Sequence, residues 1–469
     1  MNRYIRLKHL AFLTAIAFAL PIFSADKYWT GASSTNANVA ANWCDDAALT
    51  VVSTAAPTSG DDIHLTSGSV AMLWNINDIE INSWEQDGYT GTVLFRTGKL
   101  NGVTDGLNNN ARGRVYGYTD SSGNRILKVT EDIVLNTGSW TVHPQPSITS
   151  NLDAWKNGQG VYRLLVDVGG DVTIGTGATV NLKGKGFASQ QGPGCASSND
   201  CAAHGGSGSY FQTKANTIKC YGIVSGPITI GSGGRNGGGG GAVKITCQGA
   251  ITVNGTIDVT GANPGSYHSG SGGSINITAA SISGTGTLNA NGGTGGNASY
   301  DIGGGGGRIA VILTGEGAAF SSFTGTVKAK LGGKTGSSAA GDGSGGTIYI
   351  EEKADGAKCG TLIIDGCEGG FASNKTSYDQ TTILSSSIFD VTPKKIIFRP
   401  EAKAKLDIGR IYDLPEIVQE SNSSLTVMGG LEIGSTTTVN LIHGCLTFRF
   451  CSAPQGRPYQ LARTATKTL

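Results

Sequence analysis

Apolar and polar residues alternate in four segments in the middle of the chain, at 177–184, 255–261, 286–292 and 325–330. A period of two residues is typical of a β-strand with one buried face. A second set of apolar segments directly follows glycine tracts, at 242–245, 274–277, 308–311 and 347–350. Both sets predict strands, and no segment of ten or more residues between them has a helical period.

The second set recurs at a drifting interval. Ala242, Ser274, Arg308 and Thr347 follow one another at 32, 34 and 39 residues, an interval that indicates stacked supersecondary units with loops of variable length. Stacking predicts inward rows of equivalent residues: Val180, Ile257, Leu288 and Val327; Leu182, Val259, Ala290 and Ala329; Val243, Ile275, Ile309 and Ile348; Ile245, Ile277, Val311 and Ile350. We therefore predict an all-β fold, namely a right-handed parallel β-helix, or solenoid, with long glycine-rich loops.

The glycine tracts between the strands allow two interpretations. The simpler one is a set of loops from coil to coil, in which glycine permits tight turns and close backbone approach. In the alternative, the tracts themselves pack as extended left-handed strands with three residues per turn, the polyproline II geometry. A phosphate-binding loop is excluded, because no tract ends in Gly-Lys-Ser/Thr.

Composition supports a repeat array. The 469 residues include 74 glycines, while charged residues are 15% and aromatic residues 7%, a bias that signals repeats. Short strand patterns continue on both sides of the glycine-rich repeats. We expect a signal peptide at 1–24, an N-terminal β segment with the first coils at 25–150, the glycine-rich β-helix repeats at 151–355, C-terminal β coils at 356–446 and a basic, disordered tail at 447–469.

The N-terminus has the organisation of a secretory signal peptide. Arg3, Arg6 and Lys8 precede the apolar run 10–20, and small residues follow at Ser24 and Ala25. The run is shorter than the about 20 apolar residues that cross a bilayer, which disfavours an uncleaved anchor. We predict an exported protein, located outside the cell, on its outer surface or in the periplasm, with no transmembrane segment after signal removal.

Removal of the signal takes three of the 35 basic side chains and leaves 32 against 34 acidic ones, so nothing favours nucleic acid as a partner. Nine cysteines in an exported protein predict local disulfides rather than a zinc site, because no Cys-x-x-Cys occurs. The expected pairs, each close in sequence, are Cys195 with Cys201, Cys359 with Cys367, Cys445 with Cys451 and, less directly, Cys220 with Cys247, which leaves Cys44 over.

Three N-terminal motifs carry a family resemblance. Tyr28-Trp29-Thr30-Gly31, Asn42-Trp43 and the segment 57–63 resemble the start of exported bacterial β-helix proteins, including autotransporter passenger domains. The segment 161–168 with the glycine-rich units resembles glycine-rich, adhesin-like exoproteins of the same group. The resemblance implies a β-helix at a cell surface, but the chain lacks the C-terminal strands of an autotransporter membrane barrel.

The outward positions of the repeats carry mostly hydroxyl and amide side chains. Threonines Thr179, Thr256, Thr287 and Thr326 are expected to align in one row, and Asn181, Asp258 and Asn289 in the next. Glycosidases and lyases need converging carboxylates, and the rows contain only Asp258, which is read as a solvated surface residue. Asp342 is a single, off-pattern candidate for calcium, and the six histidines form no recognisable triad. No catalytic, cofactor or metal residue is therefore predicted.

The sequence is compatible with three functions. The first is a secreted or cell-surface structural or adhesin-like protein without catalytic activity. Its two outward rows, which together form a Thr/Asn ladder, would make weak multivalent contacts with extracellular carbohydrate. The same ladder is also what the ordinary solvent face of a β-helix looks like. A carbohydrate-active β-helix enzyme would show a carboxylate cluster on one outer face. A carbohydrate-binding module would show an aromatic groove, for which Tyr267, Tyr300 and Tyr349 are the candidates.

Overall fold

The protein is built almost entirely from β-strands. The computed structural model describes residues 24–99, 115–145, 161–195, 202–208, 220–264, 267–295, 303–333, 344–367, 382–385, 387–407, 416–420, 424–428, 438–441 and 445–449. Strands make up 39% and helix 3%, the helix being three short 3-10 turns, η1 (Ala40–Asn42), η2 (Phe320–Ser322) and η3 (Lys353–Asp355). The predicted all-β class is confirmed, and neither of the two large sheets, which mix parallel and antiparallel pairs, closes on itself.

The strands belong to three sheets. Sheet 1 contains β2 (Trp43–Cys44), β1 (Asp26–Trp29), β3 (Asp62–Leu65), β5 (Ser83–Gln86), β10 (Ile133–Val142), β13 (Val172–Asn181), β16 (Thr256–Asp258), β19 (Thr287–Asn289) and β21 (Thr326–Lys328), with β4 (Met72–Leu73), β6 (Thr92–Phe95), β15 (Ala250–Val253) and β18 (Ser281–Ser283) beside this path. Sheet 2 contains β11 (Val161–Tyr162), β7 (Gly98–Lys99), β9 (Arg125–Val129), β12 (Leu164–Val168), β14 (Ala242–Cys247), β17 (Ser274–Ala279), β20 (Arg308–Leu313), β22 (Thr347–Glu351), β23 (Thr361–Ile364), β25 (Lys395–Phe398), β27 (Glu416–Gln419) and β29 (Thr438–Leu441), with β8 (Tyr118–Thr119) on β9. Sheet 3 contains β24 (Thr382–Ser385), β26 (Lys403–Asp407), β28 (Ser424–Met428) and β30 (Cys445–Arg449).

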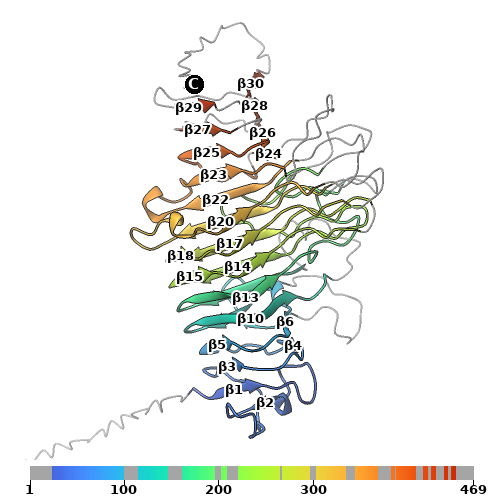
Figure 1. Ribbon diagram of the computed structural model, residues 1–469, viewed down its shortest axis with the longest axis vertical. Coiled ribbons are helices and arrows are strands. Elements are labelled where there is room, and N and C mark those ends of the chain that lie inside the picture. The colour runs from blue at the N-terminus through green and yellow to red at the C-terminus, as the bar shows by residue number, and fades with distance from the viewer. Residues whose placement is uncertain are drawn as a thin grey trace, which may run out of the picture.

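Strands that are one repeat apart in sequence lie side by side. Figure 1 shows them stacked along the long axis, from β1 at one end to β29 near the other. In sheet 1, Val180 pairs with Ile257, which pairs with Leu288. In sheet 2, Val243 pairs with Ile275, which pairs with Ile309. The predicted inward rows of paired strand residues are therefore confirmed residue by residue.

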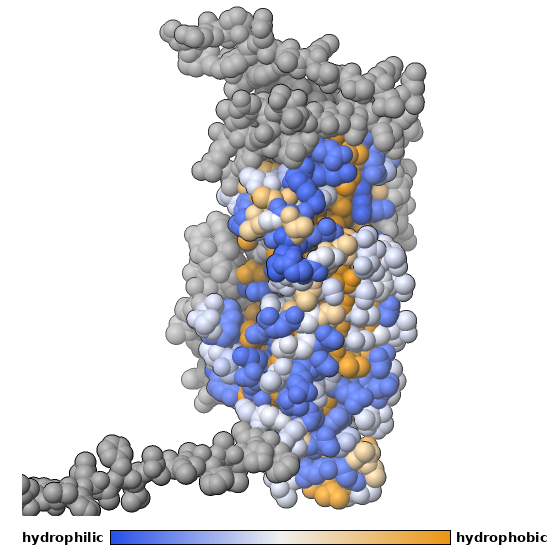
Figure 2. Space-filling view, turned by 90° about the vertical axis from the view of Figure 1, so that its left-hand side faces the viewer, coloured by the Kyte–Doolittle hydropathy of each residue, from blue (hydrophilic) through white to orange (hydrophobic). Residues whose placement is uncertain are grey.

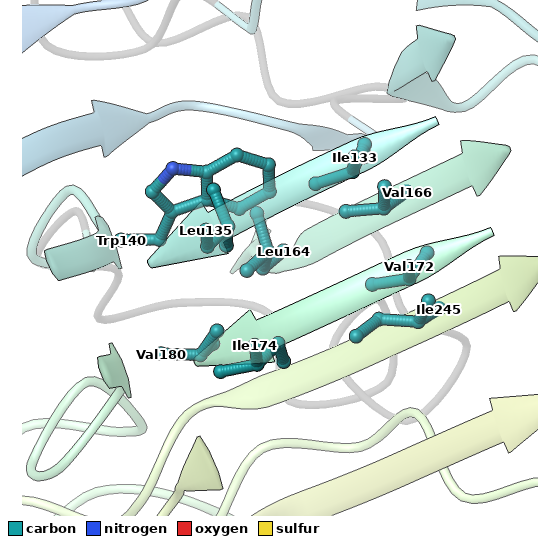
Figure 3. A pocket seen from close by; sticks show the side chains of 9 residues that line it. All are labelled: Ile133, Leu135, Trp140, Leu164, Val166, Val172, Ile174, Val180 and Ile245. Atoms are coloured by element: carbon teal, nitrogen blue, oxygen red, sulfur yellow. The ribbon is translucent and has the colours of Figure 1, made fainter. Parts of the chain in front are cut away.

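The main core lies between the apolar faces of sheets 1 and 2. The alternating inward residues of both sheets belong to one continuous buried cluster. Figure 3 shows where Trp140 and Ile174 of sheet 1 meet Leu164 and Ile245 of sheet 2. These side chains surround an apolar cavity of about 10 Å³. A cavity this small with no polar lining has the character of a packing gap and not of a ligand site.

The strand direction reverses between β22 and β23, and a second apolar core lies on the other face of sheet 2 in this part of the stack. These two strands are antiparallel, whereas β23, β25, β27 and β29 are parallel to one another. Ile363 still belongs to the main core, but its neighbours Leu362 and Ile364 belong to a second apolar cluster with Leu384 and Phe398. The second cluster begins at Ala310 of β20 and Tyr349 of β22, so sheet 2 uses its other face from β20 onward, and the cluster also includes Leu384 and Ala404 of sheet 3.

The glycine-rich segments form a packed layer beside the sheets, which we call the glycine layer. It comprises the described glycine-rich parts of 184–194, 202–207, 231–241, 261–273, 292–293, 303–307 and 344–346, whose residues are largely buried. Figure 1 shows the green to yellow coil segments gathered on one side of the stack of strands. The N–H groups of 270–273 donate in turn to the carbonyl groups of Ala262, Ser232, Gly305 and Val259.

The same hydrogen-bond pattern recurs one repeat later. The N–H groups of 304–307 donate in turn to Gly293, Ala202, Ser344 and Ala290. In both segments the first and fourth residues bond to the same neighbouring segment, so the backbone has a period of three residues, as polyproline II does. The interpretation as simple loops is therefore wrong for these segments, and the packed alternative is the one that the hydrogen bonds support. These segments need glycine because their backbones are in close contact: a Cβ on Gly240 would lie 1.8 Å from the Val259 carbonyl oxygen.

The N-terminal tryptophan motifs have a structural explanation in this fold. Trp29 and Trp43 are buried with their rings edge to face, 5.2 Å between centroids. The fully buried Asn42 accepts hydrogen bonds at Oδ1 from the N–H groups of Ser33 and Ser34. Strand β2 runs antiparallel to β1 and ends sheet 1. These residues close the N-terminal end of the core.

Candidate functional site

Outward hydroxyl groups of sheet 1 form one continuous row along the stack. Thr179 pairs in register with Thr256, Thr256 with Thr287 and Thr287 with Thr326. The row continues in the other direction, because Thr179 pairs with Ser139 and Ser139 with Thr92. We call Thr92, Ser139, Thr179, Thr256, Thr287 and Thr326 the hydroxyl row. Neighbouring strands lie about 4.8 Å apart, so its six residues span about 24 Å.

Sequence reasoning found four of these six residues. It missed Thr92 and Ser139, which carry the same local signal: Gly91-Thr92-Val93 and Gly138-Ser139-Trp140 repeat the order glycine, hydroxyl residue, apolar residue. The apolar residue in each, Val93 or Trp140, is buried like its counterparts Val180 and Ile257. The hydroxyl row is therefore longer than predicted and begins before the glycine-rich repeats.

The residues two positions further along each strand form a second row, the amide row: Asn181, Asp258, Asn289 and Lys328. Three of its side chains, those of Asn181, Asp258 and Asn289, accept hydrogen bonds within the protein. Asp258 Oδ1 accepts from the N–H of Thr260 at 2.9 Å, and Asn289 Oδ1 accepts from the N–H of Asn291 at 3.2 Å. The two predicted rows thus differ in role, because Asn181, Asp258 and Asn289 stabilise the turns that follow their strands.

The hydroxyl row differs in having no internal hydrogen bonds. Within the described part of the protein, none of its six side-chain oxygens has a hydrogen-bond partner, and all six residues are at least partly exposed. On the neighbouring outward row, by contrast, Thr252 Oγ1 lies 3.1 Å from Ser283 Oγ. The hydroxyl row is therefore a surface of open donors and acceptors held at a fixed spacing by a rigid sheet.

A histidine between two carboxylates lies on the outer face of sheet 1, near its N-terminal end. His64 Nε2 is 3.0 Å from Asp26 Oδ1, and Nδ1 is 3.0 Å from Glu85 Oε2. The ring stacks on Tyr28, with 4.6 Å between centroids. Register explains the group, because Tyr28 pairs with His64 and His64 pairs with Glu85. Sequence reasoning missed this group, because Asp26, His64 and Glu85 are far apart in the sequence and are brought together only by the pairing of β1, β3 and β5.

A buried polar cluster joins the glycine layer to sheet 2. His204 Nδ1 lies 2.8 Å from the Gly272 carbonyl oxygen, and Nε2 lies 2.7 Å from Thr229 Oγ1. Arg308 donates from Nε to the Tyr221 carbonyl oxygen at 2.9 Å. Burial, reinforced by the charge of Arg308, lowers the pKa of His204 to about 3, and burial lowers that of Arg308 to about 10. The cluster is covered by protein and acts as a structural crosslink.

The aromatic candidates do not form a groove within the described residues. Tyr349 is completely buried, and its hydroxyl group donates to Glu351 at 2.7 Å. Tyr267 is half-buried, with the guanidinium of Arg235 4.0 Å from its ring centroid. Tyr300 lies outside the described residues, as does Asp342.

Two of the expected disulfides, Cys359 with Cys367 and Cys220 with Cys247, are not formed. Cys359 has a free thiol 3.5 Å from Thr392 Oγ1, so the bridge to Cys367 is not formed. Strand β23 lies between the two cysteines and separates them by more than the about 7 Å that a disulfide spans. Cys247 donates its thiol to the Gly170 carbonyl oxygen at 3.2 Å and is not bonded to Cys220, which lies in a different apolar cluster.

The other two pairs stay predictions. Cys201 and Cys451 lie outside the described residues, and the side chain of Cys445 is not described, so nothing further follows for Cys195 with Cys201 or Cys445 with Cys451. Among the described side chains, no group of three or more His, Cys, Asp or Glu residues is arranged to hold a metal ion.

Comparison with known proteins gives no relative from which a site could be transferred to this chain. No model of a known protein family, no curated protein and no solved structure matches the chain.

In the part of the chain that the structure describes, no helix is long and apolar enough to span a membrane. Figure 2 shows one side of the molecule as a mainly hydrophilic and neutral surface with small apolar patches between.

Proposed function

We propose that the chain is an exported, non-catalytic structural or adhesive protein that contacts extracellular carbohydrate through its hydroxyl row. In this proposal the stacked strands form a right-handed parallel β-helix, which holds the row rigid. The N-terminal signal pattern and the resemblance to adhesin-like exoproteins support a location outside the cell, secreted or at the cell surface.

The observation that carries the proposal is the set of six aligned, partly exposed hydroxyl groups without internal partners. Each hydroxyl group contributes little to binding by itself, since a neutral hydrogen bond made in water is worth about 1 kcal/mol. A row of them at fixed spacing multiplies modest affinities when the partner also repeats. This combination suits adhesion to a repetitive surface.

The test changes the last three threonines of the row together to glutamate: Thr256→Glu, Thr287→Glu and Thr326→Glu. Adhesion of protein-coated beads to glycan-coated surfaces is then measured against wild type. The matched control carries Thr246→Glu and Thr278→Glu, which pair in register on the outer face of sheet 2. We expect adhesion to be lost in the first variant and kept in the control. Equal adhesion of all three proteins would refute a role for the row.

A second candidate, a carbohydrate-active enzyme, is favoured by one observation. Asp26 and Glu85 flank His64 on a single outer face, and paired carboxylates are what glycoside hydrolysis requires. The discriminating experiment measures release of new reducing ends from a polysaccharide panel by wild type and by Glu85→Gln. Turnover that Glu85→Gln abolishes would replace the adhesive proposal with the enzymatic one, and its absence in wild type favours adhesion.

A further inference from the structure

The direction and charge of the hydroxyl row restrict what kind of carbohydrate fits it. We infer that the ligand is an extended, uncharged polysaccharide chain that lies along the long axis of the molecule, with about one sugar ring for each strand of the row. This inference rests on the proposed function and specifies its ligand.

The spacing is the first argument. The row advances by one strand, about 4.8 Å, at each residue, and it runs across the strands from β6 to β21. An extended β-1,4-linked hexose chain presents a hydroxyl-bearing ring at nearly the same interval. A linear chain laid along the stack therefore places one ring against each strand of the row. Successive rings are turned by half a turn, so the same hydroxyl groups return at every second ring, and each ring between offers hydroxyl groups of its opposite edge; a branched or compact glycan has no such regular spacing.

The second argument is the chemistry of the surface. All six side chains of the hydroxyl row are neutral. The amide row beside it carries opposite charges at Asp258 and Lys328, on strands separated by one strand. A strongly anionic or cationic chain would meet one like charge, which is unfavourable. Neutral ring hydroxyls can donate to or accept from threonine at every position.

The third argument is that the asparagines of the amide row use only their side-chain oxygens within the protein. Asn289 uses Oδ1 to accept from its own turn, and Asn181 does the same for the N–H of Lys183 at 3.1 Å. Their side-chain N–H groups are not needed for those bonds and stand beside the hydroxyl row as further donors. The ligand surface is thus two residues wide at β13 and β19, where a hydroxyl group of the hydroxyl row has the amide donor of Asn181 or Asn289 beside it.

The experiment measures affinity for β-1,4-linked glucose oligomers of increasing length, from the disaccharide upwards, by calorimetry with the full chain. We expect affinity to rise with each added ring and to level off at about six rings, the length of the row. Thr256→Val with Thr287→Val should weaken binding of the longest oligomer by about tenfold. Valine keeps the shape of threonine and suits a strand.

The matched control is Thr173→Val with Thr252→Val, on the adjacent outward row. These substitutions should change affinity by less than about twofold, since Thr252 is already paired with Ser283. Affinity that does not depend on oligomer length, equal losses in both variants, no binding at all, or tighter binding of a polyanionic chain would each overturn the inference. Adhesion in the glutamate experiment without oligomer binding would overturn this inference alone and leave the proposed function standing.

Discussion

Gly240 lies against the carbonyl group of Val259, so close that a Cβ atom on the glycine would be 1.8 Å from the oxygen. The same crowding recurs one and two repeats later, where a Cβ on Gly272 would lie 2.0 Å from the Ala290 oxygen and one on Gly306 would lie 1.9 Å from the Ala329 oxygen. The glycine layer thus exists because its segments approach each other backbone to backbone. Side chains would separate them.

Substitution in this layer should be severely destabilising. Gly240→Ala forces the backbone apart, and we expect a loss of about 3 kcal/mol in the free energy of unfolding, measured by chemical denaturation. Gly226→Ala is the control, because its Cβ would meet only side-chain atoms at 3.7 and 3.8 Å. That variant should stay within about 0.5 kcal/mol of wild type. Similar losses in both would refute the close-packed glycine layer.

The inward row of sheet 1 should carry more stability than the outward one. Leu288 is completely buried between Ile257 and Val327 on the adjacent strands. Leu288→Ala removes buried apolar surface and leaves a cavity, which costs about 2–5 kcal/mol. Thr287→Ala, one residue away on the outer face, should cost about 0.5 kcal/mol. Denaturation midpoints that fall equally would contradict the assigned register.

Acid should destabilise the protein through His204. Its folded pKa of about 3 lies below the about 6.5 of an unfolded histidine, so between these values only the unfolded chain binds the proton. The free energy of unfolding therefore decreases as the pH falls below about 6.5. Between pH 6.5 and 4.5 we expect wild type to lose about 2 kcal/mol more than His204→Gln. Parallel pH profiles would show that His204 is not held neutral.

The cysteines should differ sharply in reactivity. Cys247 is buried and its pKa is raised to about 11 by burial, so it should resist alkylation in the folded protein at pH 8. Cys359 is partly exposed and should react faster than Cys247. Peptide mapping by mass spectrometry under non-reducing conditions measures both. Equal labelling rates, or a peptide that links Cys359 to Cys367, would contradict the structure.

The register of the central repeats could be predicted from the sequence because their apolar residues alternate strictly. The segment Gly255-Thr256-Ile257-Asp258 matches Gly286-Thr287-Leu288-Asn289 position by position, so the stacked pairs follow directly. In β23 the same method fails. Leu362, Ile363 and Ile364 are all apolar, and a strand without alternation does not reveal which face is buried. The reversal of chain direction and the second core were therefore not foreseen.

The sequence could not decide between loops and a packed glycine layer, nor show which outward row has open side chains, for a different reason. Packing in the glycine layer is carried by backbone hydrogen bonds, and glycine has no side-chain pattern from which to read a three-residue period. Thr287 and Asn289 both belong to an outward row in the sequence. Only the hydrogen bond from the Asn291 N–H to Asn289 distinguishes the side chain used within the protein from the one left open.

The central claim, that the hydroxyl row is the contact surface, can be tested most directly by lysine acylation footprinting of the wild-type protein bound to the surface it adheres to. Lys183 and Lys328 flank the row, whereas Lys244 is exposed on the outer face of sheet 2, where it pairs in register with Asn276. The account predicts that binding protects Lys183 and Lys328 and leaves Lys244 as reactive as in solution. Protection of Lys244, with Lys183 and Lys328 still reactive, would contradict it.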